Sequence, residues 1–308
     1  QKIYNQFFVR SPLFDSHFCI FVRRLLFMKH GLVLEGGGMR GLFTEGFLNV
    51  LMEHGLVFDG MIGVSAGALF GCGYKSHQPQ RGLKCNIRFI GDKEYMSFRS
   101  LLKTGNLSSP EYAYHTVTTE LEPIDTETFE KDFMEFYVVC TDIEKGIPVY
   151  KKITKCDYEG LEWIRATASM PLVSTPIELD GKKLLDGGMT DSVPLRYFQS
   201  IGYEKNIVML TQPHGYRKKA SLLNNIFRLT NRKYPKIAEV MINRHNMYNS
   251  EMEYIESEAK KGNTFVVYPD ETLNIGRIEQ NAEKMRHVYE LGRQKAEQLL
   301  PQIIKFLE

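Results

Sequence analysis

Three short motifs in this 308-residue chain combine glycines with side chains that can carry out chemistry. They are Gly36-Gly37-Gly38-Met39-Arg40-Gly41, Gly63-Val64-Ser65-Ala66-Gly67 and Asp186-Gly187-Gly188. A serine hydroxyl is a weak nucleophile at neutral pH and needs a base within hydrogen-bond reach. Glycines beside such groups let the backbone approach a reacting atom closely. The three motifs therefore predict a nucleophile, a base and a set of backbone N–H donors.

The first motif lies between an apolar run and a predicted helix. Its GxGxxG spacing also fits a dinucleotide-binding turn, but Asp59 lies at the start of the second predicted strand, whereas the ribose contact belongs at the end of that strand. A P-loop is excluded because no Gly-Lys-Ser/Thr sequence follows. Free N–H groups at a helix N-terminus favour negative charge, either a phosphate or a transient oxyanion. A tight turn without a ligand is a further interpretation.

The second and third motifs supply the nucleophile and the base. In GxSxG, Ser65 occupies the strand-to-helix turn that a nucleophile elbow requires, although a helix start capped by Ser65 is the alternative. Asp186 ends the returning strand of a predicted hairpin. The turn of that hairpin is Asp180-Gly181, so hairpin geometry leaves Asp186 unexplained, and burial would raise its proton affinity enough for a base. The alternative is a plain β-turn aspartate.

The elements that must position these motifs alternate along the chain. Strands are predicted at 31–35 and 58–64, each followed by a helix, which indicates parallel strands joined by a right-handed crossover. Further predicted elements are strands at 133–142, 147–153, 206–211 and 264–268 and helices at 161–168 and 276–300. This order is typical of an α/β fold.

The three motifs, in this order and topology, resemble the patatin-like phospholipases, acyl hydrolases with a serine–aspartate dyad and no histidine. Residues 164–194 also resemble the block around the catalytic aspartate of that family, so the resemblance covers residues 28–211. The family's aspartate motif often ends in alanine, where this chain has Gly188. The resemblance implies a three-layer α/β/α fold with a mostly parallel sheet, and hydrolysis of lipid carboxyl esters of the phospholipase A or lysophospholipase type.

The resemblance also implies a role for each motif residue. Ser65 is the expected nucleophile and Asp186 the expected proton acceptor, with backbone N–H groups of Gly37, Gly38 and Met39 as the oxyanion hole. We expect Arg40 to order the turn through its guanidinium donors, with binding of a lipid phosphate as the alternative. The motifs are supported by glycines: Gly36, Gly41, Gly63, Gly67, Gly187 and Gly188. We expect neither a metal nor a cofactor.

Two other functions fit parts of the sequence. His214 follows a predicted strand after Asp186, which is the chain order of an α/β-hydrolase triad, so Ser65-Asp186-His214 is a rival mechanism. A non-catalytic module that binds an anion at the glycine turn would explain that turn, but it would leave Ser65 and Asp186 as coincidences.

Composition places few limits on function. A net charge of +2 gives no drive toward nucleic acid, and five scattered cysteines without a CxxC pair suggest a reducing, cytoplasmic location. Residues 217–244 carry eight basic side chains and one acidic one among apolar residues. This stretch either contacts an anionic surface, as at the inner face of a membrane, or forms a solvated helix packed by its apolar stripe.

The expected domain organisation is simple. Residues 1–27 are predicted to be an N-terminal extension outside the core, because Met28 falls just before the first clear strand. Residues 28–308 are predicted to form a single hydrolase domain. Within it, residues 28–211 carry the motifs, whereas residues 212–308 contain no motif with an assigned role.

Overall fold

The computed structural model describes residues 28–95, 100–101, 104–221 and 234–308. The predicted N-terminal extension, residues 1–27, lies outside the described residues. So do residues 222–233, which contain the apolar part of the basic stretch.

The core of the fold is an eight-stranded mixed sheet with the order β5-β6-β3-β2-β1-β7-β8, in which β4 also pairs with β3. Its strands are β1 (His30–Leu34), β2 (Gly60–Val64), β3 (Glu135–Asp142), β4 (Ile147–Ile153), β5 (Ile177–Leu179), β6 (Lys182–Asp186), β7 (Lys205–Met209) and β8 (Thr264–Val267). Strands β3, β2, β1, β7 and β8 run parallel, and β4, β5 and β6 form the antiparallel pairs. The predicted α/β fold with a mostly parallel sheet is confirmed.

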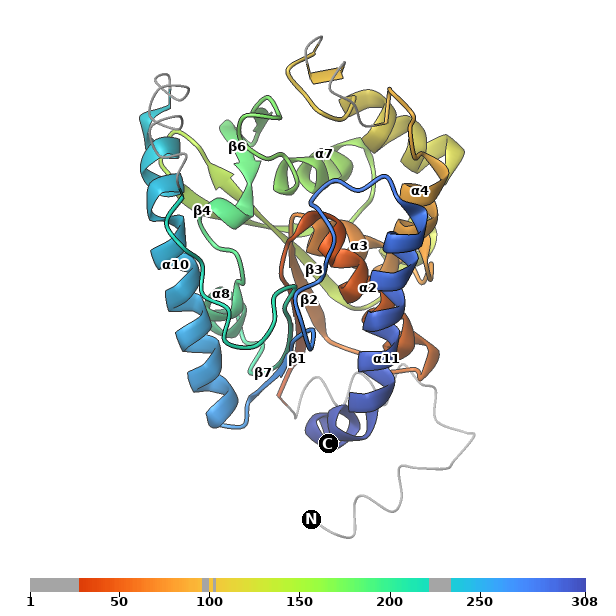
Figure 1. The fold of residues 1–308 in the computed structure, drawn as a ribbon, viewed down its shortest axis with the longest axis vertical. Helices are drawn as coiled ribbons and strands as arrows, with labels where there is room; N and C mark the ends of the chain where they lie inside the picture. The colour runs from red at the N-terminus through yellow and green to blue at the C-terminus, as the bar shows by residue number, and fades with distance from the viewer. Residues whose placement is uncertain (1–27, 96–99, 102–103, 222–233) are drawn as a thin grey trace.

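Helices cover both faces of this sheet (Figure 1). They are η1 (Gly38–Arg40), α2 (Gly41–Glu53), α3 (Ala66–Lys75), α4 (Arg81–Arg88), η2 (Tyr112–Leu121), α6 (Thr126–Lys131), α7 (Tyr158–Thr167), η3 (Gly187–Met189), α8 (Leu195–Ser200), α10 (Pro235–Lys260) and α11 (Ala282–Leu307). Successive strand residues point to opposite faces, so Leu32 and Leu34 pack with α2, α3 and α11, whereas Val33 packs with α8 and α10. The result is a three-layer α/β/α arrangement.

The C-terminal helices differ from the sequence prediction. The closing helix α11 begins at Ala282 rather than at residue 276, because Asn281 caps it by accepting from the N–H groups of Glu283 and Lys284 at 2.9 and 3.1 Å. It ends at Leu307, beyond the predicted end at residue 300. The 26-residue helix α10 was not predicted as such; it buries an apolar stripe that includes Tyr248, Met252 and Ile255.

Helix α11 packs very closely against α2. A Cβ atom added to Gly46 would lie 2.0 Å from the carbonyl oxygen of Tyr289, and one added to Gly292 would lie 2.0 Å from that of Phe43. Both helices therefore need glycine at the point where their backbones meet. This contact joins the C-terminal part of the chain to the part that carries the motifs.

Candidate active site

Strand β3 brings the second and third motifs together. Strand β4 pairs with β3 along one edge, from Phe136 to Asp142, so β2 and β6 must share the other edge. On that edge Val64 of β2 pairs with Val139, and Asp186 of β6 pairs with the next residue, Cys140. The end of β2 therefore meets the end of β6. Ser65 and Asp186 become neighbours although they are far apart in the sequence.

Ser65 has the strained backbone of a sharp strand-to-helix turn, with φ 53° and ψ −124°. The turn is tight enough to require its flanking glycines. A Cβ atom on Gly67 would lie 2.5 Å from the carbonyl oxygen of Leu34, and one on Gly63 would lie 2.7 Å from Cα of Ala68. The N–H of Ser65 donates to Oγ1 of buried Thr167 at 3.0 Å, which anchors the strained residue.

Asp186 is buried beside Ser65, whose hydroxyl favours the charged form of the aspartate carboxyl. Oδ1 of Asp186 accepts from the N–H of Gly188 at 2.8 Å. Burial raises the pKa of this carboxyl above its ordinary value, although the hydroxyl of Ser65, the N–H of Gly188 and the charge of Arg244 oppose the rise. The carboxylate is therefore a stronger base than an exposed aspartate.

The glycine turn lies directly beside Ser65. A Cβ atom on Gly36 would lie 2.9 Å from Cβ of Ser65, and Gly38 has a φ of +60°, so neither position accepts a side chain easily. No described residue accepts a hydrogen bond from the N–H of Gly37 or Gly38. The N–H of Met39 instead donates to the carbonyl of Arg277 at 3.3 Å. Two of the three predicted oxyanion donors are thus unoccupied.

Buried side chains hold the turn in place from below. The carboxylate of Glu35 accepts from the N–H of Thr211 at 2.6 Å and from its hydroxyl at 3.0 Å. The hydroxyl of Tyr248, on α10, donates to the other oxygen of Glu35 at 3.0 Å. These bonds tie β1, the end of β7 and α10 to the residue that starts the turn.

Two cavities meet at Ser65, which lines both of them together with Gly38 and Arg277. The first, of about 210 Å³, is mainly apolar. Its apolar lining includes Leu69, Phe70, Leu107, Val117, Ile124, Leu161 and Ile164. The second, of about 270 Å³, also contains Asp186 and four cationic side chains, Arg40, Lys218, Arg244 and Arg277. An apolar chain and an anionic group can therefore be held on either side of one nucleophile.

The ordering role expected for Arg40 stays a prediction. Its Nη2 lies against the turn, 3.2 Å from the position of a Cβ atom on Gly37, and its buried Nε has no hydrogen-bond partner among the described residues. The side chain also lines the second cavity. The turn is ordered by Glu35 and Thr211, which the sequence did not single out.

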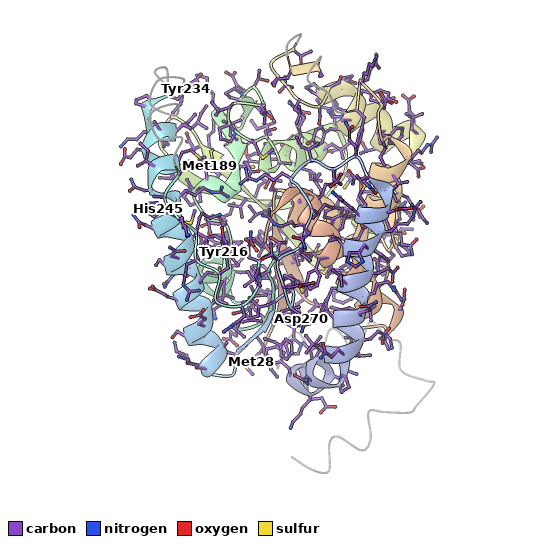
Figure 2. All side chains as sticks on the ribbon, viewed as in Figure 1. Met28, Met189, Tyr216, Tyr234, His245 and Asp270 are labelled. Carbon is purple, nitrogen blue, oxygen red and sulfur yellow. The ribbon has the colours of Figure 1, made fainter. Side chains whose placement is uncertain are left out.

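The basic stretch, residues 217–244, has several different environments where it is described. Lys218 and Arg244 line the second cavity, whereas Arg217 pairs with Glu256 at 2.9 Å and Lys236 with Glu239 at 2.8 Å. The segment that carries Lys218 lies against α10, where Tyr216 meets Tyr248 edge-on with ring centroids 6.0 Å apart (Figure 2). The described part of the stretch therefore provides few free cations for a membrane surface.

His214 lies apart from the dyad. It is exposed, its ring meets that of Tyr268 at 5.0 Å, and it lines a separate surface depression with Arg217 and Glu256. Neither cavity at Ser65 has a histidine among its described lining residues. The geometry therefore gives the rival triad no support.

The described residues contain no group of three or more histidine, cysteine, aspartate or glutamate side chains able to hold a metal ion. Among them, no helix is both long enough and apolar enough to cross a membrane.

Most of the chain matches known protein families. Residues 32–198 match the patatin-like phospholipase family. The chain belongs to that family. Its patatin-like region contains all three motifs and implies a lipid acyl hydrolase. Residues 234–308 match a domain of unknown function, DUF6363, so α10, β8 and α11 lie outside the patatin-like region.

Relatives of this patatin-like protein include one described as uncharacterized and several named as lysophospholipases. It is 26% identical over 268 residues to the uncharacterized protein YjjU of Escherichia coli, covering 85% of this chain and 74% of YjjU. It is 31% identical over 209 residues to lysophospholipase NTE1 of Pyricularia oryzae, covering 65% of this chain but only 13% of NTE1. Among solved structures, VipD of Legionella pneumophila aligns with a TM-score of 0.44 and 13% identity, covering 89% of this chain and 67% of that chain.

Sequence reasoning missed the residues that surround the motifs. Thr167 lies within the segment that resembles the family's aspartate block, so its position offered a signal. Lys218 and Arg244 were counted only as part of a basic stretch, and Arg277 was placed in a predicted helix. No local pattern indicates that these three side chains share a cavity with Ser65.

Proposed function

We propose that this protein is a serine acyl hydrolase that cleaves lipid carboxyl esters, as a phospholipase A or lysophospholipase does. One observation carries the proposal: Ser65, on a strained turn, lies in one cavity with buried Asp186 and beside two free backbone N–H groups. An adjoining apolar cavity of about 210 Å³ offers space for part of an acyl chain. The lysophospholipase relatives support the same class of substrate.

In the first half of the reaction, Asp186 takes the proton of the Ser65 hydroxyl as its oxygen attacks the ester carbonyl carbon. The C=O double bond becomes a C–O⁻ single bond, and the N–H groups of Gly37 and Gly38 donate to that oxyanion. Met39 can join them only by releasing the carbonyl of Arg277. When the intermediate collapses, the bond to the leaving alcohol breaks and Asp186 returns its proton to the alcohol oxygen. An acyl-serine remains.

In the second half, water replaces the alcohol. Asp186 removes a proton from the water as its oxygen attacks the acyl carbonyl, and the same two N–H groups hold the second oxyanion. The bond to Ser65 then breaks, the serine oxygen regains the proton from Asp186, and the fatty acid leaves. Losing one such N–H donor typically raises a barrier by about 3 kcal/mol.

Covalent labelling tests this proposal directly. A fluorophosphonate phosphonylates an activated serine with loss of fluoride, so we expect the wild-type protein to be labelled and Ser65→Ala to be unlabelled. Ser200→Ala, which changes an exposed serine on α8, is the matched control and should be labelled as the wild type is. A folded wild-type protein that takes up no label would contradict the proposal.

The base is tested by a second matched pair. Asp186→Asn removes the proton acceptor but keeps the shape of the side chain, and we expect hydrolysis of a soluble ester to fall by about 100-fold or more. Asp180→Asn changes the aspartate at the turn of the same hairpin, where asparagine accepts the observed positive φ of 48°. His214→Ala should retain activity; an inactive but folded His214→Ala variant would favour the triad instead.

A further inference from the structure

The second cavity at Ser65, here called the cationic cavity, has an excess of positive charge. Four cations line it: Arg40, Lys218, Arg244 and Arg277. The acidic side chains in its lining are Glu35 and Asp186. Within the described residues, no ion pair joins any of the four cations to a carboxylate.

Both carboxylates of the cavity are already engaged by neutral donors. Glu35 accepts from Thr211 and Tyr248, and Asp186 accepts from Gly188. Their two negative charges act on the nearby cations but offset four positive charges only in part. Four cations around one cavity with two carboxylates favour an anionic ligand.

The cations themselves are only partly satisfied. The buried Nε of Arg40 has no acceptor among the described residues. Arg244 donates through its Nε to the carbonyl of Gly188, and the ammonium of Lys218 lies 4.3 Å from the ring centroid of Tyr248. Burial and the nearby charges of Arg244, Arg277 and Arg40 lower the pKa of Lys218 to about 8, although the charge of Glu35 opposes this shift. The four groups are therefore close enough to repel one another in the absence of an anion.

Gly188 provides space for one of these cations. A Cβ atom at this position would lie 3.3 Å from Nη2 of Arg244 and 3.1 Å from Oδ1 of Asp186, tighter than ordinary contact. Glycine at this position leaves room for the guanidinium of Arg244. Lys218, Arg244 and Arg277 all lie outside the patatin-like region, residues 32–198. Three of the four cations of the cationic cavity thus come from the C-terminal part of the chain.

We propose that the cationic cavity binds an anionic headgroup of the substrate, so that the enzyme prefers acyl esters that carry an exposed phosphomonoester over those that carry phosphocholine. This inference rests on the proposed function. Ser65 lies between the apolar cavity and the cationic cavity, as an ester bond lies between an acyl chain and a headgroup phosphate. A phosphomonoester carries a charge of about −1.5 to −2 at pH 7. The positive end of phosphocholine would instead be repelled.

The test compares two substrates that differ only in the headgroup. Octanoyl esters of glycerophosphate and of glycerophosphocholine are used as monomers, because the charge of a micelle or vesicle would confuse the result. We expect the ratio of their kcat/KM values to favour the phosphomonoester in the wild type. Lys218→Met should lower this ratio by about ten-fold, since it removes one charged hydrogen-bond donor. Arg277→Met should lower it by about three-fold, because the side chain is exposed to solvent and screened.

Matched controls separate local binding from general charge. Lys219→Met and Arg286→Met each remove one exposed cation that lies outside both cavities, so they should leave the ratio unchanged. An unchanged ratio in folded Lys218→Met and Arg277→Met would overturn the inference. So would a ratio that falls equally in all four variants, because the effect would then come from net charge.

Inorganic phosphate distinguishes a headgroup site from a site for a free anion. Phosphate should inhibit hydrolysis of the phosphomonoester competitively, and Lys218→Met should weaken that inhibition. If inhibition depends on Lys218 but the ratio of the two substrates does not, the cavity binds a free anion and the headgroup assignment is wrong.

Calorimetry with the Ser65→Ala variant makes the test independent of turnover. Octanoyl glycerophosphate should bind more tightly to Ser65→Ala than to the double variant that also carries Lys218→Met. A protein that takes up no fluorophosphonate but shows this difference would refute the proposed function and leave the binding site standing. A labelled enzyme without the difference would refute only the headgroup site.

Discussion

The hydroxyl of Thr167 holds the backbone of Ser65 in place. Removing this hydroxyl should change the position of the nucleophile while its chemical groups stay the same. Its Oγ1 accepts from the N–H of Ser65 at 3.0 Å and donates to the carbonyl of Val139. The side chain is fully buried. Thr167→Val keeps nearly the same shape but leaves the N–H of Ser65 without an acceptor.

The expected effect on stability follows from that single group. A buried donor without a partner costs about 1–3 kcal/mol. Ser65 also stores about 1–3 kcal/mol of strain at its unfavourable φ, and a turn that relaxes without the anchor recovers part of it. We therefore expect Thr167→Val to lose about 1–3 kcal/mol in the free energy of unfolding, measured by urea denaturation. A turn that relaxes would also move Oγ of Ser65 away from Asp186, and a shift of about 1 Å can slow a reaction about 100-fold.

The assay is the rate of fluorophosphonate labelling, measured on protein that circular dichroism shows to be folded. Thr167→Ser is the matched control, because it keeps the hydroxyl and removes one buried methyl group. It should lose about 1 kcal/mol of stability and be labelled much faster than Thr167→Val. If Thr167→Val were labelled at the wild-type rate, the anchor would have no role in positioning the nucleophile. If Thr167→Val and Thr167→Ser were equally stable, the inference that Thr167→Val leaves a buried N–H of Ser65 without an acceptor would be wrong.

Three further predictions concern pH and packing. Burial raises the pKa of Asp186, so the kcat/KM for an uncharged ester should fall on acidification at a pH above the pKa of an ordinary aspartate. A pH–rate profile that falls only at or below the pKa of an ordinary aspartate would contradict this. Burial and the charge of Asp191 raise the pKa of Glu251 in the folded protein. The stability that this carboxyl contributes is therefore fully present below the pKa of glutamate in the unfolded chain. It is lost as the pH rises through the higher pKa of the folded state. Glu251→Gln should therefore gain stability relative to the wild type between pH 5 and 8, and equal urea midpoints across that range would refute the buried acid pair. Gly292→Ala would place Cβ 2.0 Å from the carbonyl of Phe43, so thermal denaturation should show a loss of about 1–3 kcal/mol, and a variant as stable as the wild type would mean that α11 shifts freely.

Much of the scaffold was predictable because it depends on local patterns. The glycine turn, GxSxG and the hairpin around Asp180-Gly181 each require particular backbone angles within a few residues, and the sequence displays those requirements directly. The observed strands begin or end within two residues of the predicted ones at β1, β2, β7 and β8. The family membership then explains why the three motifs occur together.

The helices α10 and α11 were harder to predict. The start of α11 depends on a capping side chain, Asn281, whose geometry is visible only in three dimensions. The stripe of α10 mixes tyrosine, methionine and isoleucine with charged residues, so its periodicity is weak until the surface that it covers is known.

The sequence by itself determined which residues are able to do chemistry, because a nucleophile, a base and bare glycines can be recognised by type and spacing. It pointed to Ser65 and Asp186 as partners but gave no reason for their contact. The tertiary structure decided that contact, since β2 and β6 pair with neighbouring residues on one edge of β3. It also decided that Arg40, Lys218, Arg244 and Arg277 surround one cavity. Charges from four separate segments act together only after the chain has folded, because their interaction depends on distance in space and not on separation in sequence.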